Sequence, residues 1–382
     1  MHLAIDAINI RQGGGITHLA QMLQVAQPNL YGFKKVTVWS SRATADLLPD
    51  RPWLVKRSLP WMDSSLLRRI IGHQFQFGYE LVAHKCDVLF SPGGTFPRAE
   101  GLSMVAMSQN MLPFEPVEAY KFGRLSLMRL KMYIIKMMQM RSFKRANGLI
   151  FLSEYAERVI KHALDYIPCR SQLVKHGIES RFFQEPRQQR KADSCSAQLP
   201  FKILYVSILM PYKHQKEVAL AAADLYAKGI PIEMRFIGAS WGNYGLEFKE
   251  VINKIDPDEK FLIWNGPENF EDIPKFYCDA DAFVFASSCE NLPNILIEAM
   301  ASGLAIASSD RGPMPEVLGS AGIYFNPESF VSIADALTEL INDDELRKNL
   351  AYEAWRKAQQ YSWERCAHDT FKFIADVAQK NG

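Results

Sequence analysis

The sequence has few of the features that mark metalloproteins, disulfide-stabilised secreted proteins or membrane-spanning proteins. Its 382 residues include only 6 cysteines, and none has the paired spacing of a zinc site, so buried or free thiols are expected instead of metal ligands or disulfides. No apolar run reaches the length of about 18 residues that a membrane-spanning helix needs. Residues 1–6 are typical of a first strand and not of a signal peptide. We therefore expect a cytoplasmic protein that binds no metal.

Complete signatures of nucleotide cofactors and of nucleic-acid recognition are also lacking. The glycine-rich turn at residues 13–15 follows an expected strand at residues 3–10, but it is neither a full dinucleotide fingerprint nor a P-loop. Such a turn still lets the backbone approach a ligand closely. The chain has no recognition motif for nucleic acid, and its aromatic residues do not alternate with its cations, so no nucleic-acid partner is expected.

The length and composition are typical of two ordinary globular domains. With 382 residues, of which 48% are hydrophobic and 23% charged, each half of the chain is long enough to bury its own core. Residues 181–200 are rich in Gln, Arg, Lys and Ser, which indicates a linker. We predict an amino-terminal domain over 1–180, a second domain over 201–360 and a last helix over 361–382, with strands at residues 3–10, 35–38, 86–90, 104–107, 148–152, 201–206, 232–237 and 281–286.

The net charge of +2 hides an asymmetry between the two halves. Residues 1–180 hold 23 Lys and Arg against 13 Asp and Glu, a net charge of +10, and the remaining 21 against 29 give −8. Over residues 120–145, cations are interleaved with apolar residues and no acid intervenes, which predicts a long helix with an apolar and a cationic face. Such a helix lies on an anionic membrane surface, receives a phosphorylated lipid, or is a core helix with solvated cations. Its cations include Arg124, Arg129, Lys131 and Lys136.

A strand–loop–helix unit is indicated around residue 290. The apolar run at residues 281–286 is typical of a buried parallel strand. Asn291 suits the cap of the following helix, Pro293 its first turn and Gly303 its end.

Glu290 and Glu298 lie on this unit in positions suited to a ligand. Glu290 falls in the loop at the carboxyl end of the strand, where ligands of open α/β sheets bind and where helix amides attract negative charge. A carboxylate there would repel a bare phosphate, so we expect it to accept hydrogen bonds from hydroxyls of a phosphate-linked ligand such as a sugar nucleotide. Glu298 follows about two helical turns later and would face another part of that ligand. The alternative interpretation is that both are solvated acids on the surface of a helix. Their spacing alone does not decide between the two interpretations.

The run ENLPNILIEAMASGLAIASSD, which begins at Glu290, resembles the donor-site signature of retaining glycosyltransferase family 4. The resemblance extends in the family's order and spacing to RGPMPEV downstream and, upstream, to LIWNGPENFEDIPKFYCDADAFVFASS and FKILYVSILMPYKHQKEV. It covers residues 200–360 well and the amino-terminal half loosely. It implies an α/β protein of the GT-B fold, in which two Rossmann-like domains have parallel sheets that face each other across an interdomain cleft.

The resemblance also implies roles for particular residues. Lys213 would neutralise the donor diphosphate, Glu290 would accept hydroxyls of the transferred sugar, and Glu298 would accept ribose hydroxyls. Retaining members are thought to react on one face of the sugar, with the leaving diphosphate taking the acceptor's proton. The other residues expected to bind the donor are Asn291, Leu292, Ser207, Gly266 and Pro267 of the second domain, and Gly14 and Gly15 in the first loop of the amino-terminal domain.

Two positions depart from the family pattern. The family usually places an arginine near Ile208 to act with the lysine at Lys213, and here a helix N-terminus or Arg11 is expected to supply that second positive charge. Many relatives also have a histidine–aspartate pair where this chain has Gln109 and Asn110. Neither amide is a general base near neutral pH, but both form hydrogen bonds. Asn110 is therefore expected either to act at a sugar or acceptor hydroxyl or to form a turn.

The resemblance thus implies transfer of a hexose or deoxyhexose from a nucleotide diphosphate sugar to a hydroxyl of a lipid-linked or polysaccharide acceptor, without cofactor or metal. The ENLPN and SQNMLPFEP segments look most like polysaccharide-assembly members, such as O-antigen mannosyl- or rhamnosyltransferases, acting at the inner face of the cytoplasmic membrane. A non-catalytic assembly subunit and a sugar-nucleotide epimerase remain alternatives. The subunit would bind no nucleotide sugar, and the epimerase would convert the donor without any acceptor.

Overall fold

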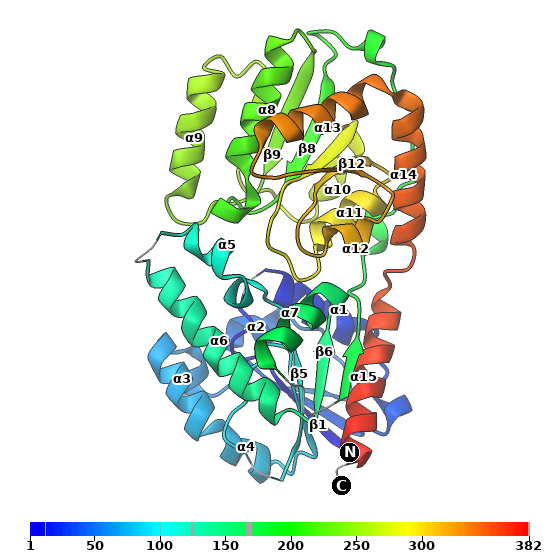
Figure 1. Ribbon diagram of the computed structural model, residues 1–382. Coiled ribbons are helices and arrows are strands. Elements are labelled where there is room, and N and C mark those ends of the chain that lie inside the picture. The colour runs from blue at the N-terminus through cyan, green and yellow to red at the C-terminus, as the bar shows by residue number, and fades with distance from the viewer. Residues whose placement is uncertain (12, 100, 124–125, 166–169, 381–382) are drawn as a thin grey trace. The chain divides into compact units, whose positions relative to one another are not determined.

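The computed structural model describes residues 1–382 apart from 12, 100, 124–125, 166–169 and 381–382. Contacts divide the chain into two compact units. The first unit consists of residues 1–116, 125–177 and 361–382, and the second of residues 117–124 and 178–360. Each unit is an α/β body built on a sheet of parallel strands (Figure 1). The predicted class, two α/β domains with parallel sheets, is confirmed.

The sheet of the first unit has seven strands in the order β3-β2-β1-β4-β5-β6-β7. Leu3 of β1 pairs with Val36 of β2 on one side and with Val88 of β4 on the other. Every residue of β1, β4, β5 and β6 is buried, as expected for central strands covered on both faces. The strands are β1 (His2–Asp6), β2 (Lys35–Trp39), β3 (Leu54–Arg57), β4 (Val88–Ser91), β5 (Ser103–Met107), β6 (Gly148–Phe151) and β7 (Arg170–Leu173).

Helices of the first unit flank this sheet. The last helix of the chain, α15, packs against α1, β5 and β6 (Figure 1). The helices are α1 (Gly14–Val25), α2 (Arg42–Asp46), α3 (Leu66–Phe75), α4 (Phe77–Ala83), α6 (Leu127–Arg145), α7 (Glu154–Leu164) and α15 (Trp363–Lys380), with short 3-10 helices at Pro28–Tyr31, Pro60–Asp63 and Leu112–Phe114.

The sheet of the second unit has six strands in the order β10-β9-β8-β11-β12-β13. The apolar run of β11 and the mostly apolar run of β8 supply its centre, since all of β11 and all of β8 except Lys202 are buried. The strands are β8 (Phe201–Val206), β9 (Ile232–Ile237), β10 (Leu262–Trp264), β11 (Ala282–Phe285), β12 (Ala305–Ser309) and β13 (Ile323–Phe325).

In the second unit, α8 packs on α9 and α13, while α11 packs on α14. Helix α5 (Pro116–Tyr120) falls almost wholly within residues 117–124 of this unit, although it comes from the amino-terminal half of the chain. The other helices are α8 (Gln215–Ala227), α9 (Tyr244–Ile255), α10 (Ile273–Asp279), α11 (Asn294–Ala301), α12 (Met314–Leu318), α13 (Phe330–Asn342) and α14 (Asp344–Ala358), with 3-10 helices at Ser180–Phe182, Ala192–Ser194 and Pro211–Lys213.

Two predicted elements differ from the structure. The strand expected over residues 3–10 ends at Asp6, whose Oδ1 accepts a hydrogen bond from the Ile8 amide at 3.2 Å and so turns the chain. The single helix expected over residues 120–145 is divided between α5 and α6. Gly123 lies between them with a φ of 101°, and Ser126 starts α6 by accepting a hydrogen bond from the Arg129 amide. A left-handed glycine and a side-chain cap both favour a new helix start there.

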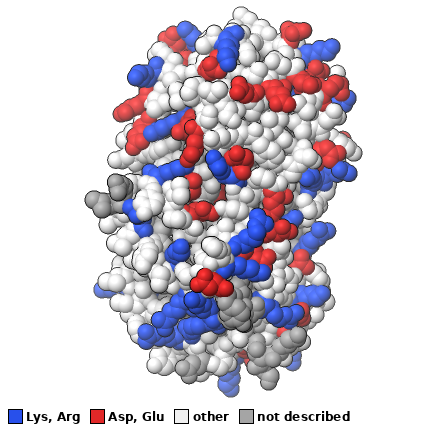
Figure 2. All heavy atoms as spheres, viewed as in Figure 1, with Lys and Arg blue, Asp and Glu red and all other residues white. Residues whose placement is uncertain are grey.

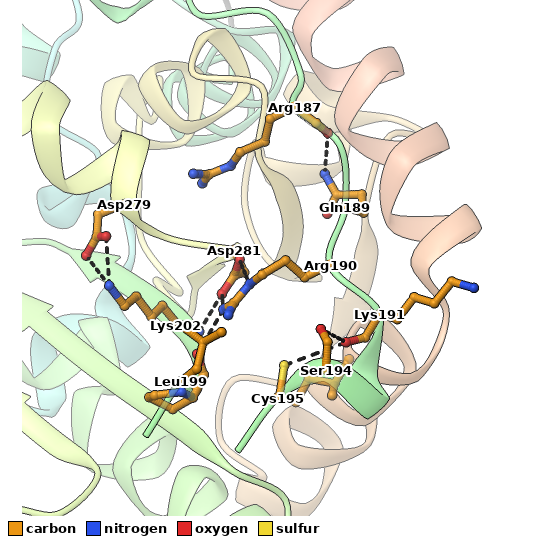
Figure 3. A network of polar contacts seen from close by, with 12 residues as sticks. Arg187, Gln189, Arg190, Lys191, Ser194, Cys195, Leu199, Lys202, Asp279 and Asp281 are labelled. Carbon is orange, nitrogen blue, oxygen red and sulfur yellow. Dashed lines mark hydrogen bonds and ion pairs between the residues drawn. The ribbon is translucent and has the colours of Figure 1, made fainter. Parts of the chain in front are cut away.

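Residues 181–200, expected to be a linker, are bonded to the second unit (Figure 3). Asp281 accepts hydrogen bonds from the Arg190 guanidinium and, at 2.8 Å, from the Lys202 amide. Arg347 is fully buried and donates to the carbonyl oxygens of Arg190 and Ile341. Arg190 therefore anchors this segment, while most of its other polar side chains are exposed.

The charges of the chain are unevenly distributed over the folded surface. On the face shown in Figure 2, basic side chains predominate over the first unit, and acidic side chains are concentrated over the second. This agrees with the +10 and −8 counted in the sequence.

Candidate functional site

The strand order of the second sheet reverses between β8 and β11. At such a point the loops that follow the two strands separate toward opposite faces, and the crevice between them is the usual ligand site of an open α/β sheet. In this protein one hydrogen bond links the loop after β8 to the loop after β11, because the Ser288 amide donates to the Tyr212 carbonyl oxygen at 2.9 Å. The topology thus places the residues after β8 and after β11 at one site.

Lys213 and Glu290, two of the residues predicted to act in catalysis, meet where these two loops are joined. The Lys213 Nζ donates to the Glu290 Oε1, and the two side chains are only 6% and 17% exposed. The Tyr205 hydroxyl donates to the Lys213 carbonyl oxygen at 2.5 Å. The rings of Tyr212 and Phe285 lie 5.4 and 5.6 Å from Nζ. An ion pair sheltered in this way acts on a nearby charge more strongly than one in bulk water.

Glu298 lies on α11 and is partly buried. Its Oε2 is 3.2 Å from the Tyr277 hydroxyl, which also lies 3.3 Å from the Ile295 carbonyl oxygen. Burial raises the pKa of Glu298 to about 8, so the carboxyl is mostly protonated at neutral pH. A protonated carboxyl both donates and accepts hydrogen bonds, which suits a pair of neighbouring hydroxyls.

The start of α11 corrects the expected helix start. The helix begins at Asn294 with Pro293 as its N-cap, so Asn291 does not cap it. Asn291 and Leu292 instead lie buried in the loop, where the Leu292 carbonyl oxygen accepts a hydrogen bond from the Asn294 amide at 3.0 Å. Gly303 ends the helix with a φ of 66°, as predicted.

Ser207, Gly266 and Pro267 lie in the loops after β8 and β10. Ser207 is buried, and its hydroxyl donates to the Ile208 carbonyl oxygen at 3.1 Å. The Gly266 carbonyl oxygen accepts from the Gly238 amide at 2.8 Å. Gly266 and Pro267 line a cavity of about 530 Å³ beside Trp264. These two residues, which are expected to bind the donor, therefore lie at a cavity of the second unit.

The other residues predicted for ligand contact belong to the first unit. Gly14 and Gly15 open α1, and a side chain at Gly15 would come within 3.2 Å of the Gln109 Oε1. Gln109 also lies 3.0 Å from the His18 Nδ1. Asn110 is exposed and its Oδ1 accepts a hydrogen bond from the Leu112 amide at 3.1 Å, the geometry of a turn-forming asparagine.

The cations predicted to face an acceptor or a membrane lie on and before α6. Arg124 is outside the described residues. Arg129 is partly buried, Lys131 is exposed, and the Lys136 Nζ lies 5.8 Å from the centre of the Phe114 ring. None of the described helices, α6 included, is long and apolar enough to cross a bilayer.

The structure also shows polar residues near the site that sequence reasoning did not select as ligand contacts. The family's usual arginine is missing near Ile208. Arg11, one of the candidates to supply that positive charge, lies in the first unit and donates to the Met62 carbonyl oxygen. In the second unit Lys121 lies 3.2 Å from the Nε2 of His214, the residue after Lys213. No spacing rule links residues 93 positions apart. Across the described part of the chain, no three His, Cys, Asp or Glu side chains are grouped to hold a metal.

Solved structures place this fold in a known class. The chain aligns over 97% of its length with sucrose-phosphate synthase from Thermosynechococcus elongatus, covering 97% of that chain with a TM-score of 0.76 and 15% identity. WaaG, a glycosyltransferase involved in lipopolysaccharide biosynthesis, aligns over 98% of this chain and 99% of its own, with a TM-score of 0.73 and 15% identity. The fold is that of the GT-B glycosyltransferases.

The second unit has a more specific match. Residues 187–357, which include Lys213, Glu290 and Glu298, match the family model of glycosyl transferases group 1. Spore coat protein SA of Bacillus subtilis (strain 168) is 26% identical over 256 residues, 61% of this chain and 65% of that protein. O-antigen chain mannosyltransferase B of Escherichia coli is 32% identical over 100 residues, 26% of each. The chain spans less than two thirds of the length of either relative. Together these matches show the GT-B fold for the chain and a sequence similarity of its second unit to the glycosyl transferases group 1.

Proposed function

We propose that the protein is a retaining glycosyltransferase of family 4 that moves a hexose or deoxyhexose from a nucleotide diphosphate sugar to a hydroxyl of a lipid-linked glycan. One observation carries the proposal. The crevice at the strand reversal holds a sheltered Lys213–Glu290 pair, with Glu298 on the adjoining helix, within the segment that matches the group 1 glycosyl transferases.

The donor would lie along this crevice in the second unit. The Lys213 ammonium would contact the diphosphate and stabilise the charge that builds up on it as it leaves, which is worth several kcal/mol in a sheltered site. Glu290 would share its carboxylate between Lys213 and the sugar hydroxyls. Glu298 would donate to one ribose hydroxyl and accept from the other. The cavity at Gly266 and Pro267 would receive the base.

Transfer would proceed on one face of the sugar. The bond between the anomeric carbon and the diphosphate oxygen breaks, and its electron pair remains on the diphosphate. The acceptor hydroxyl oxygen then bonds to the anomeric carbon from the same side, and its proton passes to the departing oxygen. No side-chain base is needed, in keeping with the amide of Asn110 at a position where many relatives carry an ionisable pair.

The surface of α6 favours a lipid-linked acceptor. Leu127, Leu130, Ile134 and Met137 are spaced along one face of the helix and are between 47% and 85% exposed. Exposed cations, Lys131, Arg141 and Lys144, occur on the same helix. An exposed apolar stripe among cations matches the interior and the anionic head groups of a membrane surface. We therefore place the enzyme at the inner face of the cytoplasmic membrane.

The relatives favour a role in cell-surface polysaccharide or O-antigen assembly. Their names include an O-antigen chain mannosyltransferase and a glycosyltransferase of lipopolysaccharide biosynthesis. HepE from Anabaena, solved with UDP and glucose, aligns over 97% of this chain and 98% of its own with a TM-score of 0.68 and 15% identity. A nucleotide diphosphate sugar carrying mannose or rhamnose is the donor we favour.

Thermal stabilisation by GDP-, UDP- and dTDP-sugars tests the proposal directly. One nucleotide class should raise the melting temperature of the full chain, and Glu298→Ala should abolish that rise while leaving the protein folded. Glu339→Ala, a matched change at an exposed glutamate of α13, should respond like the wild type. Absence of stabilisation by every nucleotide sugar would favour the non-catalytic subunit. Conversion of the stabilising sugar without any acceptor would favour the epimerase.

A further inference from the structure

A second cavity, of about 790 Å³, opens in the second unit. Neither Lys213 nor Glu290 lines it. Its walls come from the start of α8, from the start of α9 and the loop before it, and from residues 117–124 of the amino-terminal half of the chain. The volume falls in the range of about 300–1,000 Å³ that is usual for small-molecule sites.

The wall formed by residues 117–124 is firmly bonded to the rest of the unit. The Ser288 hydroxyl donates to the Glu118 carboxylate at 2.6 Å. The Lys121 Nζ lies 3.1 Å from Glu118 and 2.7 Å from Glu328. Because Ser288 follows β11 and Glu328 follows β13, this short segment is tied to two loops of the sheet. This wall of the cavity is therefore held in place by bonds to the rest of the unit.

Aromatic rings supply the apolar part of the cavity. Phe122 meets Trp241 edge to face, with their ring centres 5.1 Å apart. Tyr244, at the start of α9, has the Lys216 Nζ 4.7 Å from its ring centre. Trp241 is 38% exposed, so much of a large flat ring remains available. Rings of this kind pack against the C–H face of another molecule while leaving its polar edge free.

Both lysines that line the cavity are already paired with glutamates. Lys216 bonds Glu247 at 2.7 Å, and Lys121 bonds Glu328 at 2.7 Å. The His214 Nδ1 lies 3.7 Å from the Glu217 carboxylate. A ligand with a strong net charge would have to separate one of these pairs, whereas a neutral ligand can exchange hydrogen bonds with both members of a pair. The site thus favours a molecule rich in hydroxyls and without net charge.

We infer that this cavity is a binding site for a neutral saccharide, which stacks on Trp241 and Phe122 and exchanges hydroxyl hydrogen bonds with the Lys216–Glu247 and Lys121–Glu328 pairs. The inference deepens the proposed function and rests on it in one respect, because the saccharide would be part of the glycan acceptor. His214 lines the cavity and follows Lys213, so the two sites share one turn of the chain.

Binding to an array of immobilised neutral and anionic oligosaccharides tests the inference without turnover. The labelled full chain should be retained by neutral glycans. Trp241→Ala and Phe122→Ala, made separately so that either alone is informative, should each weaken that binding by about tenfold. Tyr79→Ala, at an exposed aromatic residue of the first unit, and Glu298→Ala should bind the same glycans as the wild type.

The outcomes separate the two proposals. Preference for anionic glycans, or equal binding by the wild type and both aromatic variants, would overturn the neutral-saccharide site. Stabilisation by a nucleotide sugar together with no glycan binding would leave the proposed function standing and remove the inference. Glycan binding lost in both aromatic variants, with no response to any nucleotide sugar, would keep the saccharide site and remove the transferase.

Discussion

Among single residues, Glu298 is a carboxyl whose environment opposes its charge. It accepts from Tyr277, but burial is the largest influence on it and raises its pKa from 4.5 to about 8. The folded protein therefore holds this proton more tightly than the unfolded chain does between about pH 4.5 and 8. Stability should fall as the pH rises through that window and level off above it.

Glu298→Gln should remove this loss, because glutamine keeps the shape of the side chain and has no proton to release. We expect the variant to be more stable than the wild type by on the order of 2–4 kcal/mol at pH 8 and about equally stable at pH 5. Chemical denaturation of both proteins at the two pH values measures the difference. A stability gap of the same size at pH 5 and pH 8 would contradict the raised pKa.

At the scale of elements, α6 is unusual because its outward face is apolar. A surface helix normally turns such residues toward the core, but Leu130 and Ile134 are exposed while Phe143 near the other end of the helix is fully buried. Met132 in the second turn is buried as well, so the helix packs through one face along its length and exposes apolar side chains on another. This division is what a membrane-contacting helix of a water-soluble domain requires.

Replacing Leu130 and Ile134 by Glu should prevent binding to membranes, because the two charges resist insertion and repel anionic lipid. The wild type should float with phosphatidylglycerol vesicles at low salt and partly dissociate at about 1 M NaCl, where charge attraction is screened. The double variant should remain at the bottom of the gradient. Leu30→Glu, at another exposed leucine of the first unit, is the control and should float normally. Equal flotation of the wild type and the double variant would contradict the assignment of α6.

For the molecule as a whole, the main result is that the two units do not follow the order of the chain. Residues 117–124 belong to the second unit, and residues 361–382 to the first. The chain therefore passes between the units four times. The first segment to enter the second unit, residues 117–124, contains Glu118 and Lys121. Both bond to residues that come much later in the sequence.

Lys121→Met should destabilise the second unit, since it leaves the mostly buried Glu118 carboxylate without its cation. We expect a loss on the order of 1–3 kcal/mol, measured by thermal unfolding of the full chain. Lys228→Met breaks an exposed ion pair with Asp224 and should cause no measurable loss. Equal melting temperatures for Lys121→Met and the wild type would mean that the segment is held by its apolar contacts.

Much of this architecture was predictable from local patterns. The mostly apolar runs at residues 201–206 and 281–286 predicted β8 and β11, because buried parallel strands need nearly continuous apolar sequence, and β9 was predicted at residues 232–237, where apolar and charged residues alternate at first. The strands β3, β7, β10, β12 and β13 were missed. At least half of the residues in β3 and β7 are polar, and β10 and β13 have only three residues each, so these four carry a weak apolar signal. The start of α11 was misplaced by reliance on Asn291 as a cap, whereas Asn291 and Leu292 form a bend and the helix begins only after Pro293.

The sequence by itself determined that this is a two-domain α/β protein, and it identified Glu290, Glu298 and Lys213 as candidate ligand contacts by their motifs. Only the tertiary structure decided that Lys213 and Glu290 form one sheltered pair, because the order of β8 and β11 in the sheet brings their loops together. It also decided that Glu298 is a protonated carboxyl and that residues 117–124 complete a cavity of the second unit. Burial and long-range ion pairs depend on which distant segments become neighbours, and local spacing carries no information about that.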